Sequence, residues 1–320
     1  MTSDLTIEAT GLEKSYNSTP VVSGISFRVP RGTVFALLGP NGAGKTTTVR
    51  MLATLTAPDG GVASVAGHDV VAQRSDVRRR ISLTGQYAAV DGLQTGAENL
   101  RMIGRLQGLR RATARARACE LLDRFDLVDA GGRRVGTYSG GMRRRLDLAA
   151  SLMRQPSVLF LDEPTTGLDP RSRRQLWSLV GSLVSDGVTL FLTTQYLDEA
   201  DALADRIAVL DRGRIAAEGS AAELKATVGG RRLVVHAVSP GTLEAVALVA
   251  GPRVVDCDPG LLTLDVACEG EGPEVRALLD ELDPDRDRIA DFSVRTASLD
   301  DVFLTLTGHT TTAERERTDD

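Results

Sequence analysis

Lysine is almost absent from this chain, since only Lys14, Lys45 and Lys225 stand among 35 arginines. Because arginine supplies nearly every other positive charge, we expect a position that keeps lysine to need lysine itself. Cysteine and histidine are also scarce, with three of each at wide spacing, which excludes a disulfide framework and a zinc site of the usual spacing. These absences predict a reduced, cytosolic compartment.

Long hydrophobic runs are absent as well. A membrane-spanning helix needs about 20 consecutive apolar residues, whereas the longest apolar runs, such as 34–38 and 158–161, have the length of strands. The first four residues lack the basic and apolar regions of a secretory signal. Since 42% of the residues are hydrophobic and 25% are charged, the composition predicts a folded, soluble protein.

The length of 320 residues indicates two domains, because a domain usually has about 100–200 residues. The charge distribution supports this division. Residues 228–320 carry 9 arginines and 19 acidic residues, a net charge of −10, whereas residues 1–227 carry +5. We predict a first domain over 1–227, an accessory domain over 228–307 and a disordered tail over 308–320.

The first domain alternates between apolar runs of strand length and helical stretches. This order predicts an α/β fold in which helices cover both faces of a mostly parallel sheet. Residues 98–124 are rich in Leu, Ala and Arg and predict one continuous helix, within a helical insert of about 87–150. The predicted strands are 34–38, 156–161 and 188–192, and the predicted helices are 45–55, 143–153 and 171–184.

The second domain is predicted to be a small α+β domain. Its apolar pattern gives the order β-α-β-β-α-β of the ferredoxin-like fold, followed by a helix over 299–306 with Ser298 as its N-cap. The predicted strands are 233–237, 254–258, 261–267 and 289–295, and the predicted helices are 242–249 and 274–282.

A phosphate-binding loop is the strongest signal in the chain. Residues 39–46 match the pattern G-x-x-x-x-G-K-[ST], after a buried strand and before a helix. Glycines let backbone amides approach phosphate oxygens, Lys45 can bridge the β- and γ-phosphates, and Thr46 can offer its hydroxyl to Mg²⁺. The alternative is a glycine-rich turn without a ligand, which the context and the retained lysine disfavour. The expected ATP-binding residues here are Gly39, Pro40, Asn41, Gly42, Ala43, Gly44, Lys45, Thr46 and Thr47.

Two adjacent carboxylates, Asp162 and Glu163, follow the apolar run 158–161. Successive side chains of a strand point to opposite faces, so Asp162 can face a metal ion while Glu163 takes a proton from water. Taken alone, the pattern fits a buried strand followed by a solvated turn equally well. After a phosphate-binding loop the catalytic interpretation is favoured, because phosphoryl transfer needs both a metal carboxylate and a base.

A third motif, Ser139-Gly140-Gly141, precedes a helix and offers another anion-binding N-terminus, although it is weak alone. The order of the three motifs resembles the ATP-binding cassette of ABC transporters, a P-loop NTPase fold, over about residues 5–227. Tyr138 and Met142 replace the usual residues of the signature. Together with the variant switch segment 193–200 and the appended domain, this signature resembles the branch of daunorubicin/doxorubicin-resistance ATP-binding proteins.

The resemblance implies further site residues. Tyr16 resembles the aromatic residue that stacks on adenine, and Gln86 resembles the glutamine that contacts Mg²⁺ and couples to a membrane subunit. Asp169 corresponds to the D-loop, and Gln195 stands where the family usually has its switch histidine. Ser139, Gly140 and Gly141 are implied to complete the ATP site of a second copy. The implied catalytic residues are Lys45, Glu163 and Gln195, and the implied Mg²⁺ ligands are Thr46, Gln86 and Asp162.

The resemblance also implies an ATPase subunit of a drug or antibiotic exporter. It would act as a homodimer at the cytoplasmic face of the cell membrane, bound to a separately encoded transmembrane permease. The alternative is a non-transport ABC ATPase that acts on the ribosome or on DNA. No nucleic acid partner is expected, because the arginine clusters 78–80, 110–117 and 143–145 lack interleaved aromatic residues and the chain is acidic. We expect a solvated or subunit-facing surface for these clusters.

Overall fold

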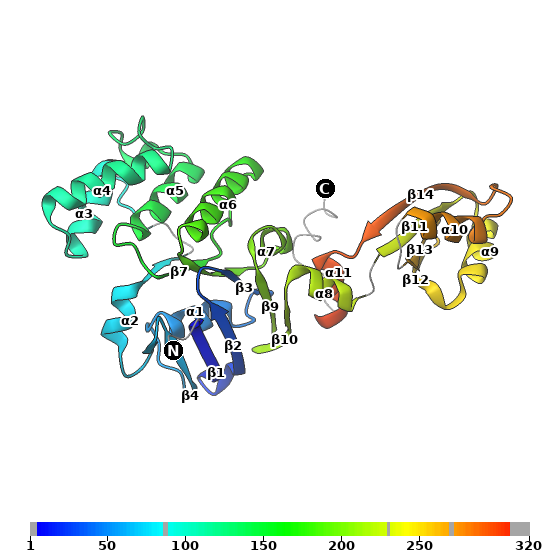
Figure 1. The fold of residues 1–320 in the computed structure, drawn as a ribbon, viewed down its shortest axis with the longest axis horizontal. Helices are drawn as coiled ribbons and strands as arrows, with labels where there is room; N and C mark the ends of the chain where they lie inside the picture. Colours follow the sequence, from blue (N-terminus) through cyan, green and yellow to red (C-terminus); the bar gives the residue numbers. More distant parts are fainter. Residues whose placement is uncertain (1–4, 86–88, 229–230, 269–271, 308–320) are drawn as a thin grey trace. The chain divides into compact units, whose positions relative to one another are not determined.

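The structure is a computed structural model, which describes residues 5–85, 89–228, 231–268 and 272–307 (Figure 1). Two sequence predictions lie outside the described residues: the disordered tail over 308–320 and the position of Gln86. The chain divides into two compact units between Ala221 and Ala222. Among the described residues, no helix combines the length and the apolar character that a membrane crossing requires.

The first unit is built on a six-stranded sheet of order β10-β9-β3-β8-β7-β6. The strands from β9 to β6 are parallel, and β10 runs antiparallel to β9 at one edge. This confirms the predicted parallel sheet. Its central strands β3, β7 and β8 are buried throughout, which explains their continuous apolar runs. The strands are Val34–Leu38 (β3), Ile81–Thr84 (β6), Val158–Asp162 (β7), Thr189–Thr194 (β8), Arg206–Asp211 (β9) and Arg214–Gly219 (β10).

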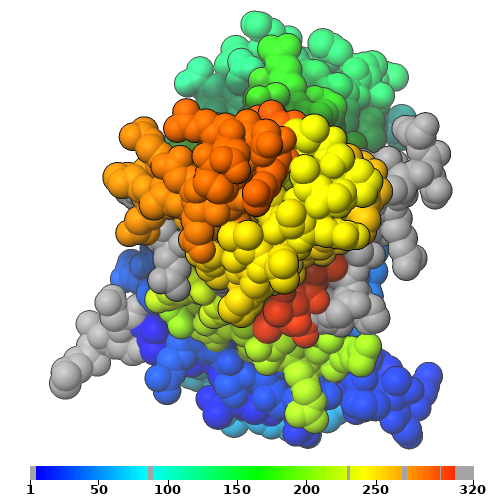
Figure 2. Space-filling view, turned by 90° about the vertical axis from the view of Figure 1, so that its right-hand side faces the viewer, coloured from blue at the N-terminus to red at the C-terminus, as the bar shows by residue number. Residues whose placement is uncertain are grey.

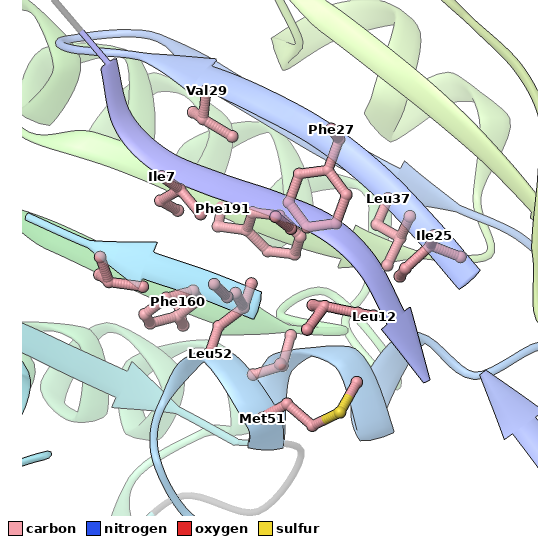
Figure 3. Close-up of a cluster of buried hydrophobic side chains, with 14 of the residues drawn as sticks. Ile7, Leu12, Ile25, Phe27, Val29, Leu37, Met51, Leu52, Phe160 and Phe191 are labelled. Atoms are coloured by element: carbon pink, nitrogen blue, oxygen red, sulfur yellow. The ribbon is translucent and has the colours of Figure 1, made fainter. Parts of the chain in front are cut away.

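A second sheet of the first unit has the order β2-β1-β4-β5 and is antiparallel. It has no counterpart among the predicted strands. Figure 3 shows its core, where Phe27 lies near Phe191 of the parallel sheet and Met51 and Leu52 of the first helix pack below. The ring centroids of Phe27 and Phe191 are 5.6 Å apart. The strands are Leu5–Tyr16 (β1), Thr19–Pro30 (β2), Gly60–Val65 (β4) and His68–Asp69 (β5).

The helices of the first unit correct one prediction. Residues 98–124 do not form one helix, because the chain leaves the helical conformation at Gln107 and Gly108 has φ of +86°. A left-handed glycine at this place ends a helix. The insert is formed by α3, α4 and α5, which lie together in Figure 1. The helices are Lys45–Leu52 (α1), Arg74–Arg80 (α2), Gly96–Leu106 (α3), Arg111–Arg124 (α4), Gly140–Ser151 (α5), Pro170–Ser185 (α6) and Leu197–Leu203 (α7).

The second unit contains an antiparallel sheet of order β12-β13-β11-β14. Its elements follow one another as β-α-β-β-α-β. The helix α9 packs on β11 and β13 and contacts α10, and Figure 2 shows α9 in yellow and α10 in orange at the surface. The elements are Ala221–Thr227 (α8), Arg231–Ala237 (β11), Pro240–Ala250 (α9), Val254–Asp258 (β12), Thr263–Cys268 (β13), Gly272–Leu282 (α10), Ile289–Thr296 (β14) and Leu299–Thr307 (α11).

Candidate functional site

The loop between β3 and α1 lies tightly against its neighbours at two glycines. A Cβ atom on Gly39 would stand 2.3 Å from the carbonyl oxygen of Leu210. Gly44 has φ of +108°, and a Cβ atom there would stand 2.7 Å from the carbonyl oxygen of Val21. Since a side chain at either position would collide with backbone, the close approach of the loop to β2 and β9 depends on glycine.

Lys45 opens α1 and is only 4% exposed. Its Nζ donates to the carbonyl oxygens of Gly39 at 2.7 Å and Pro40 at 3.1 Å, and lies 3.3 Å from Oε1 of Glu163. Burial lowers the pKa of Lys45, whereas the carboxylates of Glu163 and Asp162 act in the opposite direction. The ammonium group therefore lies between the loop and the end of β7.

Asp162 and Glu163 contact different groups, but strand alternation is not the reason, because β7 ends at Asp162 and Glu163 leaves the extended conformation. Oδ1 of Asp162 accepts hydrogen bonds from Thr46 Oγ1 at 3.2 Å and from Thr193 Oγ1 at 2.5 Å. Glu163 has φ of +49°, and its N–H donates to the carbonyl oxygen of Thr193 at 3.0 Å. A non-glycine residue in the left-handed region costs about 1–3 kcal/mol and often marks a functional site.

The signature motif begins α5. Ser139 is the N-cap, and its side chain accepts a hydrogen bond from the N–H of Met142 at 3.2 Å. Tyr138 is buried, and its hydroxyl donates to the carbonyl oxygen of Ala130 at 2.7 Å. Gly96 at the start of α3 makes room for this ring, because a Cβ atom there would stand 2.4 Å from the Tyr138 hydroxyl. The tyrosine is thus accommodated by a matching glycine.

The other predicted residues lie on separate elements. Tyr16 ends β1, is 42% exposed and has the Lys14 ammonium 5.6 Å from its ring centroid. Asp169 caps α6 and accepts from Ser172 Oγ at 2.6 Å, and this bond, with the N–H bonds of Ser172 and Arg171, lowers the pKa of Asp169. Gln195 directly follows β8. The structure therefore brings Lys45, Thr46, Asp162 and Glu163 into direct contact, while Tyr16, Ser139, Asp169 and Gln195 stand on other elements.

One expectation about the arginine clusters is wrong. Arg144 does not lie on a solvated surface but is 7% exposed, and its guanidinium group donates to the carbonyl oxygens of Pro164 and Gly85. No local pattern signals this burial, because an opposite charge three residues later, here Asp147, also occurs on exposed helix faces of this chain, as with Asp76 and Arg79. Sequence reasoning also missed Glu199, which is fully buried and accepts from Trp177 Nε1 at 3.2 Å.

Comparisons with known proteins agree with this geometry. The family model of the ABC transporter matches residues 22–166. The daunorubicin/doxorubicin resistance ATP-binding protein of Streptomyces peucetius is 55% identical, over 95% of this chain and 92% of its own. The doxorubicin resistance ATP-binding protein of Mycobacterium tuberculosis is 48% identical, over 95% of this chain and 94% of its own.

A solved structure shares the fold of the ATP-binding part. The CbiO1 protein of Clostridium perfringens, part of an ABC transporter complex, superposes with a TM-score of 0.66 at 25% identity, over 70% of this chain and 92% of its own. The similarity to these relatives over nearly the full length and the phosphate-binding loop 39–47 indicate the same family. This chain therefore belongs to the ATP-hydrolysing, ATP-binding proteins of the ABC transporter family, in the branch that includes the daunorubicin/doxorubicin resistance ATP-binding proteins.

Proposed function

We propose that this chain is the motor subunit of a drug exporter that works as a homodimer on a separately encoded transmembrane permease. The relatives named for daunorubicin and doxorubicin resistance support this cargo class. The observation that carries the ATPase assignment is the direct contact of Lys45 with Glu163 and of Thr46 with Asp162. The subunit would act at the cytoplasmic face of the membrane, through the permease.

We assign the phosphate groups of ATP to the loop 39–47. Backbone amides at the start of a helix and an ammonium group attract phosphate oxygens. The Lys45 ammonium group donates to loop carbonyls and faces Glu163. These contacts position its positive charge between the loop and the end of β7 before ATP binds. Binding of a triphosphate exchanges these contacts for phosphate oxygens and frees the Glu163 carboxylate. Tyr16, exposed at the end of β1, offers its ring to the adenine.

The donor set around Asp162 fits Mg²⁺. Thr46 Oγ1 and Asp162 Oδ1 are 3.2 Å apart, and neighbouring ligands of an octahedral Mg²⁺, each at about 2.0–2.1 Å, lie about 3 Å apart. Hydroxyl and carboxylate oxygens are also the atoms that this ion prefers. When bound, Mg²⁺ supplies the positive charge that neutralises the phosphates. We assign Gln86 as its third protein ligand from the family resemblance alone.

Glu163 is assigned as the base of hydrolysis. Its carboxylate lies beside Lys45 at the end of β7, and it takes the proton of the water that attacks the terminal phosphate. Gln195, at the end of the neighbouring strand β8, donates its amide to the transferred phosphate. Both side chains follow the carboxyl ends of adjacent parallel strands, where α/β sheets bind their ligands.

The residues on α5 and α6 are assigned to the dimer. Ser139, Gly140 and Gly141 begin a 12-residue helix whose N-terminus can bind the phosphates held by the second copy. Asp169 caps α6, and a Cβ atom on Gly141 would stand 2.5 Å from Oγ of Ser172 in the first turn of α6, so the starts of α5 and α6 lie side by side. The accessory domain, predicted over 228–307, lies in the part of the chain beyond residue 227 that carries a net charge of −10, and is assigned to assembly. It holds no phosphate-binding motif.

Co-expression with a candidate transmembrane permease tests the proposed function. Membranes that contain both subunits should hydrolyse Mg-ATP, and daunorubicin or doxorubicin should stimulate this activity. Lys45→Ala and Glu163→Gln should abolish both the basal and the stimulated rates. ATP hydrolysis that survives in Glu163→Gln would refute the assignment of the base, and basal hydrolysis that no anthracycline alters would refute the cargo class.

A further inference from the structure

Arg144 is a buried cation that the proposed function does not use. It lies on α5, five residues after Ser139, with a carboxylate oxygen of Asp147 3.5 Å from its Nη1. The charges of Asp147, Glu199 and Asp162 act on its guanidinium group. Burial lowers the pKa of Arg144, and these three carboxylates act in the opposite direction. An arginine keeps its charge in proteins even when buried, so a permanent positive charge lies next to Pro164, just after the end of β7.

The contacts of Arg144 join two segments that follow neighbouring strands. Its Nε donates to the carbonyl oxygen of Pro164 at 2.7 Å, and its Nη1 donates to the carbonyl oxygen of Gly85 at 2.6 Å. Pro164 follows Glu163, and Gly85 follows β6. Asp147, which lies 3.5 Å from Nη1, accepts a hydrogen bond from the N–H of Ala89 at 2.8 Å.

These contacts are costly to maintain for packing alone. Burying an ion pair costs several kcal/mol of desolvation per ion, and apolar residues of similar size often pack as well or better. The ion pair with Asp147 is long at 3.5 Å, and Nη2 is buried without a hydrogen-bond partner among the described residues. The well-formed bonds of Arg144 go instead to two backbone carbonyls, one of which directly follows the base.

We propose that Arg144 is a positioning residue for ATP hydrolysis. It holds the carbonyl group of Pro164 at a fixed position relative to Gly85 at the end of β6, and the adjacent Pro164 peptide in turn fixes the position of the Glu163 carboxylate. The proposal rests on the proposed role of Glu163. The planar guanidinium group is suited to this task because its fork donates to both carbonyls at once, whereas a lysine ammonium presents one compact point charge. Glu163 depends on such support because its own backbone is held at φ of +49°.

Single-turnover hydrolysis by the full-length chain tests this proposal with Arg144→Lys, which keeps the charge and loses the fork. A displacement of about 1 Å at a catalytic group costs up to about 100-fold in rate. We expect hydrolysis of saturating Mg-ATP to slow by about 10–100-fold, with ATP affinity within about twofold of the parent, since the phosphate-binding loop is untouched. The matched control is Arg154→Lys, an exposed arginine shortly after the same helix, which should hydrolyse at the parental rate.

A double-mutant cycle with Glu163→Asp identifies the route of the effect. If Arg144 acts through Glu163, Arg144→Lys should slow the Glu163→Asp protein by less than half as much, on a logarithmic scale, as it slows the parent. Full additivity, or a parental rate in Arg144→Lys, overturns the proposal. Glu163→Asp at the parental rate would instead refute the role of Glu163 itself, so the two failures are distinguishable.

A second variant covers the case in which Arg144→Lys does not fold. Asp147→Asn keeps an oxygen that can accept from the N–H of Ala89 but removes the negative charge that lies 3.5 Å from Nη1 of Arg144. We expect at least threefold slower single-turnover hydrolysis with unchanged ATP affinity. A parental rate in Asp147→Asn then overturns the proposal.

Discussion

At the scale of single residues, Gln195 is the most informative departure from the family pattern. It follows β8 directly, and its Oε1 atom is buried without a hydrogen-bond partner among the described residues. A hydrogen bond from its amide to a charged phosphate is worth about 1.5–3 kcal/mol. If this bond forms mainly in the transition state, Gln195→Ala should bind ATP normally and hydrolyse it about 10–150-fold more slowly. A parental single-turnover rate would show that Gln195 is not the switch.

The matched variant Gln195→His restores the residue that the family usually has. A histidine titrates near pH 6.5, whereas a glutamine amide does not titrate at all. Below this pKa the imidazole binds a proton and above it the ring is neutral, so the rate of Gln195→His should gain a new limb between about pH 6 and 7. The pH profile of single-turnover hydrolysis measures this limb, and identical profiles for the parent and Gln195→His would contradict the assignment.

At the scale of elements, the packing of α3 against the start of α5 depends on one tyrosine–glycine pair. Tyr138→Phe removes one of two donors to the carbonyl oxygen of Ala130, which also accepts from the N–H of Arg133 at 2.8 Å. We therefore expect a loss of about 0.5–1.5 kcal/mol in unfolding free energy, with ATP affinity unchanged. Gly96→Ala places a methyl group against the Tyr138 hydroxyl. It should therefore destabilise the parent more than it destabilises Tyr138→Phe. Urea denaturation of the three variants measures this coupling, and equal effects of Gly96→Ala in both backgrounds would exclude the predicted contact.

The end of α10 predicts a specific acid dependence. Asp283 is buried, which by itself raises its pKa, but the N–H groups of Ile289, Arg288 and Asp287 bond to its carboxylate and bring the pKa below the usual value. Because the folded-state pKa is depressed, this stabilisation is present above about pH 4 and is lost as the pH falls through the folded-state pKa. Asp283→Asn retains an acceptor oxygen but cannot titrate. The stability difference between parent and variant should therefore shrink from pH 6 to pH 3, and a constant difference would contradict this account.

The elements also show what the sequence can and cannot predict. β3, β7 and β8 are predictable because strands buried on both faces leave continuous apolar runs. β1 escapes prediction because its pairing with β2 shifts register between Ala9 and Leu12 and again beyond it, which interrupts the alternation of apolar and polar residues. β2 does carry that alternation, since Ile25, Phe27 and Val29 are buried in turn, so its strand was predictable from the sequence.

The candidate site likewise contains residues that the sequence predicts and a residue, Arg144, whose role it does not predict. Lys45, Thr46, Asp162 and Glu163 lie in local motifs whose spacing reflects their chemistry, and they meet in the structure as the motifs predict. Arg144 belongs to a basic run with no local sign of its carbonyl partners, because Gly85 and Pro164 reach it only through the fold.

At the scale of the whole molecule, the charge asymmetry predicts that the two domains have different roles, with ATP binding in the first and assembly in the second. The chain beyond residue 227 carries −10 and holds no phosphate-binding motif, whereas residues 1–227 carry +5. A chain that ends at Val228 should bind ATP with nearly parental affinity and assemble less well with its partners. Nucleotide titration and co-purification with the permease measure the two properties, after circular dichroism has established that the shortened chain is folded. Loss of ATP binding in a folded, shortened chain would contradict this division.

The central claim is that Lys45 and Glu163 belong to an ATP site that closes between two copies of the chain. Glu163→Gln tests it most directly, because the amide has the shape of the carboxylate but cannot take a proton from water. Light scattering in Mg-ATP and in Mg-ADP measures the oligomeric state, and released phosphate measures hydrolysis in the same sample. The account predicts a dimer in ATP, a monomer in ADP and no measurable turnover. A variant that stays monomeric in ATP, or that hydrolyses ATP at the parental rate, would contradict it.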